Sequence, residues 1–398
     1  IRRVAAGGTV SYARLFVVGY DLEEVRARAR EVRGEEAWPL TLSLDLEDPQ
    51  DATERAEVIL YDADDTPVAQ AWLPADERTF QLLPGTYRAR TNQAGRPTGS
   101  TGPIEVTDGP VEAALTLPST GRVEIAIGGD DFHYQPRVGL PCRVTVQAGP
   151  DADLHAGILT RFFSPDGGGS FRLPPGTYTL TAARGYEYEV VRGDVTVEAG
   201  ATTSFSGSLT RSVHSEGWIN ADFHMHGESS ADTTIPIEHR LLTLAAVGLE
   251  RLPMTDHDTI TDADPLLAPL GLDSWLRLTI GVEVSPVGKH SNAYPVTVRD
   301  DRPVYYGTPI TKGYDEAGAF LGTLTFPEIW EKMRQDFDAG ILQINHPRDG
   351  QGYLDVIGYD PDKGVDALAP GVFSTDFDTI ELINSGAITV ALEQIIPD

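Results

Sequence analysis

A nine-residue phrase occurs twice in the first half of the sequence, and it constrains the fold more than any other feature. Thr79–Tyr87 reads TFQLLPGTY, and Ser170–Tyr178 reads SFRLPPGTY. Each copy predicts two short strands joined by a type II turn, because proline presets φ at the first turn position and glycine admits the positive φ of the next. Short alternating runs separated by turn residues are typical of all-β folds. The repeat therefore predicts two β-sandwiches in tandem.

The repeated phrase resembles one inter-strand turn of the prealbumin-like β-sandwiches known as carboxypeptidase regulatory-like modules. The resemblance covers 37–119 and 120–212, so we expect one module in each range. It implies a fold and no chemistry. The modules either position a neighbouring domain or bind a glycan or protein partner. Residues 1–36 match neither copy, and the helical pattern of 22–32 indicates the remnant of a preceding domain.

Charge and cysteine content exclude some classes of function. The chain has 31 Lys and Arg against 60 Asp and Glu, a net charge of −29. So acidic a chain repels phosphate backbones, and we expect no nucleic-acid partner. No apolar run has the length of a membrane span. The single Cys142 excludes an internal disulfide and a thiolate metal cluster. These features fit a periplasmic or extracellular, secreted protein, and they also fit the cytoplasm.

After residue 213 the pattern changes to strands that alternate with helices, which predicts a barrel-like α/β domain over 213–398. Helices are expected over 236–247, 262–270 and 326–339, the last with a capping box of Thr325 and Glu328. Strands are expected over 218–226, 278–284, 341–345 and 379–384.

Histidines and carboxylates occur where these expected strands end. His224 and His226 would face the same side of a strand, because side chains at i and i+2 share a face. Strand ends meet on one face of a parallel α/β fold, where active sites form. His and carboxylate ligands without thiolates suit Zn, Mn or Fe. The sequence therefore predicts a shared metal centre; the alternative is a set of scattered structural histidines. The later residues of this pattern are His257, Glu283, His290, His346 and Glu381.

The phrases that carry these residues resemble those of the PHP (polymerase and histidinol phosphatase) superfamily of metallohydrolases, in particular its carbaryl-hydrolase-like branch. The resemblance covers about 215–390 and implies a distorted (β/α)7 barrel. The family's last motif, Gly-Ser-Asp-x-His, has no counterpart before Asp398. We therefore expect an incomplete barrel: the chain is a fragment of a longer polypeptide, a second chain completes it, or the site is degenerate.

The resemblance also implies the ligands of two to three divalent ions. The first ion would be held by His224 and His226, and Glu283 would bridge it to a second held by His290 and His346. A third would be held by His257 and Asp232, with Glu228 as a rival to Asp232. Arg348 and Lys289 are candidate catalytic cations, Asp256 is expected to orient His257, Glu381 is expected to support the site without binding metal, and His214 and His239 are expected at the surface.

Two functions follow. The first is a metal-dependent hydrolase, a phosphoesterase or an esterase, whose metal-bridging hydroxide cleaves a small phosphoester or a carboxylic or carbamate ester. The alternative is a non-enzymatic surface or assembly protein, with β-sandwich modules that bind a glycan or protein partner and a degenerate PHP-like scaffold behind them. Bound metal and chelator-sensitive hydrolysis distinguish the two.

Overall fold

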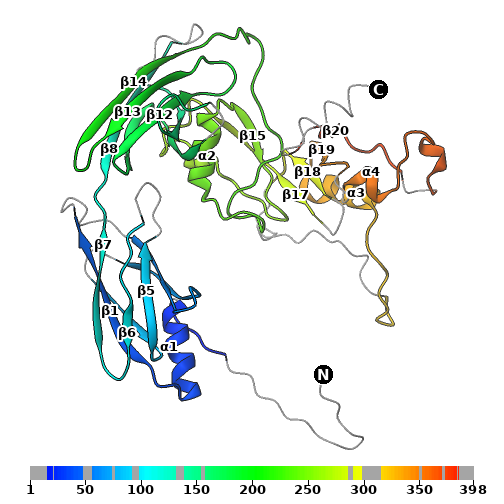
Figure 1. Cartoon of the computed structure of the whole chain (residues 1–398). Coiled ribbons are helices and arrows are strands. Elements are labelled where there is room, and N and C mark those ends of the chain that lie inside the picture. The colour runs from blue at the N-terminus through cyan, green and yellow to red at the C-terminus, as the bar shows by residue number, and fades with distance from the viewer. Residues whose placement is uncertain are drawn as a thin grey trace, which may run out of the picture.

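The computed structural model describes residues 16–20, 22–47, 56–73, 77–91, 98–130, 139–153, 157–285, 290–297, 315–348, 352–369, 373–382 and 384. In these residues the chain forms a first group of sheets, a second group of sheets, and a part after residue 213 that contains both helices and strands (Figure 1).

The first group of strands forms two sheets around one apolar core, and we call it module 1. Its sheets have the strand orders β4-β1-β7 and β3-β2-β5-β6. The core includes Leu40, Leu60 and Phe80, none of them accessible to solvent. The strands are β1 (Trp38–Leu46), β2 (Ala56–Tyr61), β3 (Pro67–Leu73), β4 (Glu77–Leu82), β5 (Gly85–Thr91), β6 (Ile104–Val106) and β7 (Val111–Leu117).

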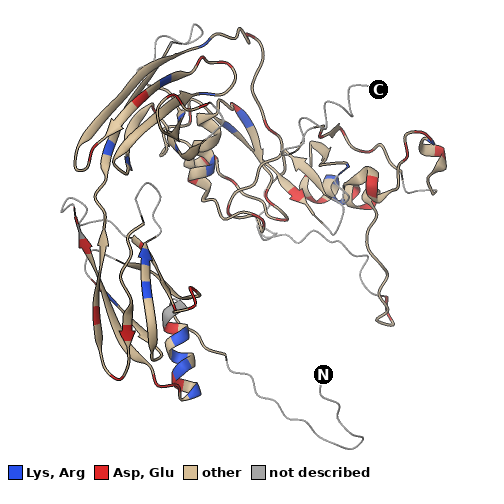
Figure 2. Ribbon diagram, in the orientation of Figure 1, with Lys and Arg blue, Asp and Glu red and all other residues tan. Residues whose placement is uncertain are grey.

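A helix, α1 (Leu22–Arg33), lies against module 1. Arginines line this helix (Figure 2). The guanidinium groups of Arg26 and Arg30 donate hydrogen bonds to the carbonyl oxygens of Val68 and Gln81, in β3 and β4. The helix is thereby held by module 1 itself.

The second group of strands, module 2, repeats this arrangement with sheet orders β10-β9-β12-β13 and β11-β8-β14. In both modules the first strand pairs in parallel with the last, β1 with β7 and β8 with β14. The lone Cys142 is buried in the module 2 core. The strands are β8 (Gly121–Asp130), β9 (Cys142–Ala148), β10 (Ile158–Ser164), β11 (Gly168–Leu173), β12 (Gly176–Ala183), β13 (Val191–Val197) and β14 (Thr202–Thr210).

The repeated phrase is explained by its tyrosine. Tyr87 donates a hydrogen bond from its hydroxyl to the carbonyl oxygen of Leu83, and Tyr178 does the same to Pro174, each at 2.8 Å. Both tyrosines are buried in their module's core. The prediction of a type II turn is wrong, because neither Gly85 nor Gly176 has a positive φ. The tyrosine hydroxyl, four residues after the carbonyl that it binds, closes the turn instead.

The part after residue 213, the C-terminal region, contains two small sheets: the parallel pair β15-β16, and a sheet of order β17-β18-β19-β20. Its longest described helices are α2 and α3. Its elements are α2 (Ile237–Ala246), β15 (Arg251–Met254), η2 (Asp264–Leu266), β16 (Arg277–Ile280), β17 (Val282–Val284), β18 (Ser291–Tyr294), α3 (Phe326–Phe337), β19 (Ile341–Ile344), α4 (Tyr353–Val356), η3 (Val365–Ala367) and β20 (Thr379–Ile380).

The predicted fold, with a truncated (β/α)7 barrel after two prealbumin-like sandwiches, is wrong. The described residues form several small sheets and show no barrel. The reason lies in the strand directions: β18 pairs antiparallel with both β17 and β19, whereas a barrel needs parallel neighbours joined by crossover helices. The expected strand over 278–284 divides at Gly281, where a Cβ atom would lie 2.9 Å from the carbonyl oxygen of Met254.

Local signals predicted the two longer helices of the C-terminal region well. The helix expected over 236–247 is α2, and the one over 326–339 is α3 with the capping box of Thr325 and Glu328 present. Two other expectations fail. Of the helix over 262–270 only the short η2 forms, and the expected strand over 218–226 is reduced to an isolated bridge between Ala221 and Arg251.

Module 2 and the C-terminal region share a buried interface. Arg184 follows β12 and donates hydrogen bonds to the carbonyl oxygens of Pro141, at 2.8 Å, and Ala245 in α2, at 2.6 Å. Its guanidinium carbon lies 4.4 Å from the ring centre of Trp275, and that ring packs against the module 2 core. At Gly185, a Cβ atom would lie 2.3 Å from the carbonyl oxygen of Val247.

Candidate metal centre

The candidate centre is built around Glu283, the middle residue of β17. Its neighbours Val282 and Val284 are buried in the core beneath the sheet. Side chains alternate along a strand, so the carboxylate of Glu283 lies on the opposite face. That face is also closed to solvent, because Glu283 is 0% exposed. A buried carboxylate needs hydrogen bonds or a cation to balance the loss of water.

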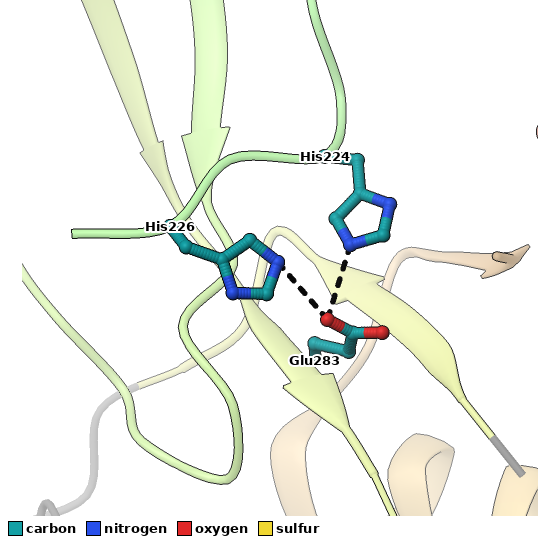
Figure 3. Close-up of side chains that lie close together, drawn as sticks. All are labelled: His224, His226 and Glu283. Atoms are coloured by element: carbon teal, nitrogen blue, oxygen red, sulfur yellow. Dashed lines mark hydrogen bonds and ion pairs between the residues drawn. The ribbon is translucent and has the colours of Figure 1, made fainter. Parts of the chain in front are cut away.

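Five imidazole rings surround this carboxylate, two of them shown in Figure 3. Around Oε2 lie the Nε2 atoms of His224 and His226, each at 3.0 Å, and Nδ1 of His257 at 3.3 Å. Around Oε1 lie Nδ1 of His290 at 3.0 Å and Nε2 of His346 at 3.6 Å.

Asp232 extends the cluster on one side. Its carboxylate oxygens lie 3.4 Å from Nδ1 of His226 and 3.7 Å from Nε2 of His257. The hydroxyl of Ser230 donates to Asp232 at 2.6 Å, which fixes the carboxylate beside the two rings. Three overlapping groups thus have ligand atoms within 4.8 Å of one another, and all contain residues expected from the sequence. The first group is His224, His226 and Glu283, the second is His226, Asp232 and His257, and the third is His257, Glu283 and His290.

The donor set fits divalent transition ions better than it fits hydrogen bonds alone. Oε2 of Glu283 has about two lone-pair sites, yet three ring nitrogens lie within 3.3 Å of it. Nδ1 of His257 is buried and lies 3.3 Å from Oε2 of Glu283, yet it forms no hydrogen bond with any described residue. Imidazole nitrogens and carboxylate oxygens at this spacing are the ligands that Zn, Mn and Fe prefer.

The electrostatics of the cluster are strongly perturbed. Burial raises the pKa of Glu283, but hydrogen bonds with His224, His226, His290 and His346 outweigh burial and hold that pKa well below its usual range. Burial lowers the pKa of His224, whereas hydrogen bonds with Glu283 and Glu381 raise it to about 10. The central carboxylate is therefore ionised at neutral pH and attracts cations.

The loop that carries His224 and His226 is held against the end of β15, although it is not a strand. The backbone N–H of Met225 donates to the Thr255 hydroxyl, and the N–H of Thr255 donates back to the Met225 carbonyl, each at 2.8 Å. Asp256, 0% exposed, accepts the N–H of Gly227 at 2.6 Å. Its other oxygen accepts the Thr261 hydroxyl. Asp256 thus positions the loop, and these contacts do not involve the ring of His257 that it was expected to orient.

A network of buried amides that the sequence analysis missed supports Glu283. The side-chain amide of Asn345 donates to Oε1 of Glu283 at 2.8 Å and to the side-chain oxygen Oδ1 of Asn292 at 2.7 Å. Gln343 links Asn345 to the hydroxyl of Tyr294. Asn345 comes directly after β19 and just before His346, and this position beside an expected ligand was the signal that the sequence offered for it.

The remaining expected residues lie apart from the cluster. Arg348 has its guanidinium 3.4 Å from Asp355 and 5.6 Å from the Tyr359 ring centre, so its charge is engaged beside α4. Lys289 lies outside the described residues. Glu228, the rival of Asp232, accepts the backbone N–H of Ile237 at the start of α2. His214 and His239 are exposed, as expected.

Comparisons with known proteins find no protein-family model that matches the chain and no matching curated protein. Among solved structures, the chain is similar to the minor pilin GBS52 of Streptococcus agalactiae and to the shaft pilin SpaA of Lactobacillus rhamnosus GG. For GBS52 the identity is 12%, the TM-score 0.26, and the coverage 45% of this chain and 98% of that one. For SpaA the values are 12%, 0.26, 45% and 99%.

These findings correct the expected identity. The described residues show no barrel, because β18 pairs antiparallel with both of its neighbours, and no protein-family model, that of the PHP superfamily included, matches the chain. The assignment to the PHP superfamily and its carbaryl-hydrolase-like branch is therefore wrong. The hydrolase activity, phosphoesterase or esterase, was expected because of that superfamily, and this expectation is wrong as well. The pilin likeness covers less than half of the chain at a low TM-score, so it does not bear on the histidine cluster itself.

Proposed function

We propose that this chain is a surface or assembly protein, the non-enzymatic of the two functions expected from the sequence, and that its C-terminal region binds two or three divalent transition ions. The observation that carries the metal proposal is the crowding of five imidazole rings around the buried carboxylate of Glu283. Without a cation, rings of this number compete for the few acceptor sites of one carboxylate. With cations between them, each ring nitrogen has a ligand bond to make.

The residues that would hold the ions are those of the three overlapping groups, with His346 on the Oε1 side of Glu283. The ions would supply positive charge to a buried acidic site and would tie together segments that are distant in sequence. These segments are the loop of 224–232, the segment around His257, β17, the start of β18 and the end of β19. In this proposal the centre stabilises the C-terminal region.

The surface or assembly role is proposed for the modules. Among the described residues, no group of three or more potential metal ligands lies in module 1 or module 2. The chain carries a net charge of −29, and acidic residues occur along all its parts (Figure 2). Such a surface keeps a protein soluble and disfavours nucleic acid. We propose a glycan or a protein as the partner of the modules and a periplasmic or extracellular location. None of the described helices is long and apolar enough to cross a membrane.

The metal proposal is tested by counting ions. Protein purified without chelators, or reloaded with Zn²⁺, Mn²⁺ or Fe²⁺ and desalted, should contain two to three ions per chain by inductively coupled plasma mass spectrometry. His226→Ala and Glu283→Gln should each reduce that number. His239→Ala is the matched control, because His239 is exposed on α2 outside the cluster. Less than one ion per chain under all three loading conditions refutes the metal proposal.

The surface role has its own experiment. Intact cells of the source organism are treated with an added protease, and the chain is followed by immunoblotting. A surface or extracellular protein is cleaved under these conditions, while a cytoplasmic control protein stays intact. Complete protection of the chain contradicts the proposed location without affecting the metal proposal.

A further inference from the structure

Glu381 lies directly beyond β20 and reaches the cluster from outside. Its backbone N–H donates to the carbonyl oxygen of Ile344 at 2.9 Å, which continues the parallel pairing of β20 with β19. This pairing fixes Glu381 beside the end of β19, where Asn345 and His346 follow. The side chain of Glu381 is 11% exposed, so its carboxylate is largely removed from water.

The carboxylate of Glu381 accepts from several donors at once. Nδ1 of His224 lies 3.2 and 3.3 Å from its two oxygens. The backbone N–H of His346 donates to Oε2 at 2.7 Å. The side-chain amide of Asn384 lies 3.1 Å from both oxygens. One carboxylate thus holds the ring of one cluster histidine and the backbone of another.

The contact with His224 decides which ring nitrogen faces the cluster as an acceptor. A neutral imidazole carries its proton on one nitrogen and a lone pair on the other. A carboxylate at Nδ1 favours the proton there, which leaves the lone pair on Nε2. The ring of His224 therefore spans two carboxylates, and Nε2, 3.0 Å from Glu283, is the nitrogen that would give up its proton and present a lone pair to an ion.

The contact with His346 supports a backbone conformation that its residue type disfavours. His346 has a φ of 26°, in the region that side chains with a Cβ atom rarely adopt. Gly352 closes against it, since a Cβ atom at 352 would lie 2.0 Å from the carbonyl oxygen of His346. The hydrogen bond to Glu381 helps to hold this turn, and the turn directs the ring towards Oε1 of Glu283.

We infer that Glu381 is a positioning residue of the metal centre, which presents His224 through its Nε2 atom and His346 through its backbone without itself binding an ion. This inference rests on the proposed metal-binding function and deepens it. A carboxylate that only stabilised β20 would contribute to folding and leave metal affinity unchanged, so the two roles are separable.

The test uses Glu381→Gln, which keeps the shape of the side chain. A glutamine is neutral and has an NH₂ group in place of one oxygen, so a donor replaces one of the two acceptors that face Nδ1 of His224 and the Asn384 amide. Affinity for Zn²⁺ is measured by competition with a chromophoric chelator, and the ligand field is read from the absorption spectrum of the Co²⁺-loaded protein. We expect a 10–100-fold loss of affinity, as is typical for groups that orient metal ligands, and a changed Co²⁺ spectrum.

Asp378→Asn is the matched control. Asp378 lies in the same segment, accepts the N–H of Leu342 at 2.7 Å and pairs with Arg334, and its partners are outside the cluster. This variant should lower the melting temperature of the metal-free protein and leave Zn²⁺ affinity and the Co²⁺ spectrum as in wild type. If both variants lower affinity equally and in proportion to their loss of stability, Glu381 has only a structural role and the inference is overturned.

The remaining outcomes are distinct. If wild type binds ions and Glu381→Gln binds them within about twofold of the wild-type affinity, the inference is overturned and the metal proposal stays in place. Wild type that binds no ions overturns both. If Glu381→Gln does not fold, Asn384→Ala decides, because it removes a donor to Glu381 while keeping the carboxylate. A several-fold loss with a changed Co²⁺ spectrum supports the inference, and unaltered binding overturns it.

Discussion

Replacement of Arg184 by methionine should uncouple module 2 from the C-terminal region. Arg184 is 4% exposed, and burial lowers the pKa of its guanidinium. It donates to one carbonyl of module 2, Pro141, and to one of α2, Ala245. Arg184→Met keeps the length and apolar character of the side chain, and it removes both donors and the charge over Trp275.

The expected loss of folding stability is the difference between lost interactions and a desolvation cost that is no longer incurred. Each hydrogen bond from a charged donor contributes about 1.5–3 kcal/mol, and the contact with the indole ring contributes up to about 2 kcal/mol when desolvated. In the opposite direction, Arg184→Met avoids the cost of burying a charge, which stabilises the folded state by several kcal/mol. Ala245 also keeps a second donor, the N–H of Gly248. The net destabilisation should be about 2–4 kcal/mol.

Urea denaturation followed by tryptophan fluorescence and by circular dichroism measures this change. Wild-type module 2 and C-terminal region should unfold together, and Arg184→Met should separate their transitions. The matched control is Arg122→Met, because Arg122 donates to Ser170 inside module 2. The control should change stability by about 1 kcal/mol or less without separating the transitions. If Arg184→Met is no more destabilising than the control, Arg184 does not join the two parts.

Three further predictions concern single groups. Burial raises the pKa of Cys142 to about 12 from its usual 9.0. The thiol therefore stays protonated in the folded protein, whereas the same thiol in the unfolded chain ionises above pH 9. The free energy of unfolding should therefore fall by about 2 kcal/mol by pH 10.5. Cys142→Ala should remove this part of the alkaline loss in urea titrations, and an identical pH slope in both proteins contradicts it. Tyr178→Phe deletes the hydroxyl bound to Pro174 and should cost about 1 kcal/mol, whereas the exposed Tyr186→Phe should cost nothing measurable in the same titration. Chelation of bound ions should lower the melting temperature of wild type and not of Glu283→Gln, and equal shifts in both would disconnect that effect from the cluster.

The sequence predicted the elements that depend on local chemistry. The capping box of Thr325 and Glu328 and the proline before α2 specify helix starts through a few neighbouring residues, and both helices form. Strand direction is different, because alternation along a strand does not distinguish a parallel from an antiparallel neighbour. The antiparallel pairing of β18 with β17 and β19 was therefore not visible, and the barrel expected from the resemblance was wrong.

For the candidate centre, the sequence indicated residue types better than it indicated roles. The structure brings the seven expected ligand candidates together, although His224 and His226 lie on a loop that is not a strand. Their convergence depends on long-range contacts such as that of Met225 with Thr255. The supporting amides and the placement of Arg348 beside Asp355 depend on side-chain directions that no local pattern specifies.

The parallel pairing of first and last strands gives each module a definite response to tension. Module 1 begins with β1 and ends with β7, which are joined over seven paired positions, and β8 and β14 are joined over nine. Because these strands run the same way, the chain enters at one end of the sheet and leaves at the other. A pull along the chain therefore slides the two strands past each other and stretches their hydrogen bonds simultaneously, not one after another as in peeling.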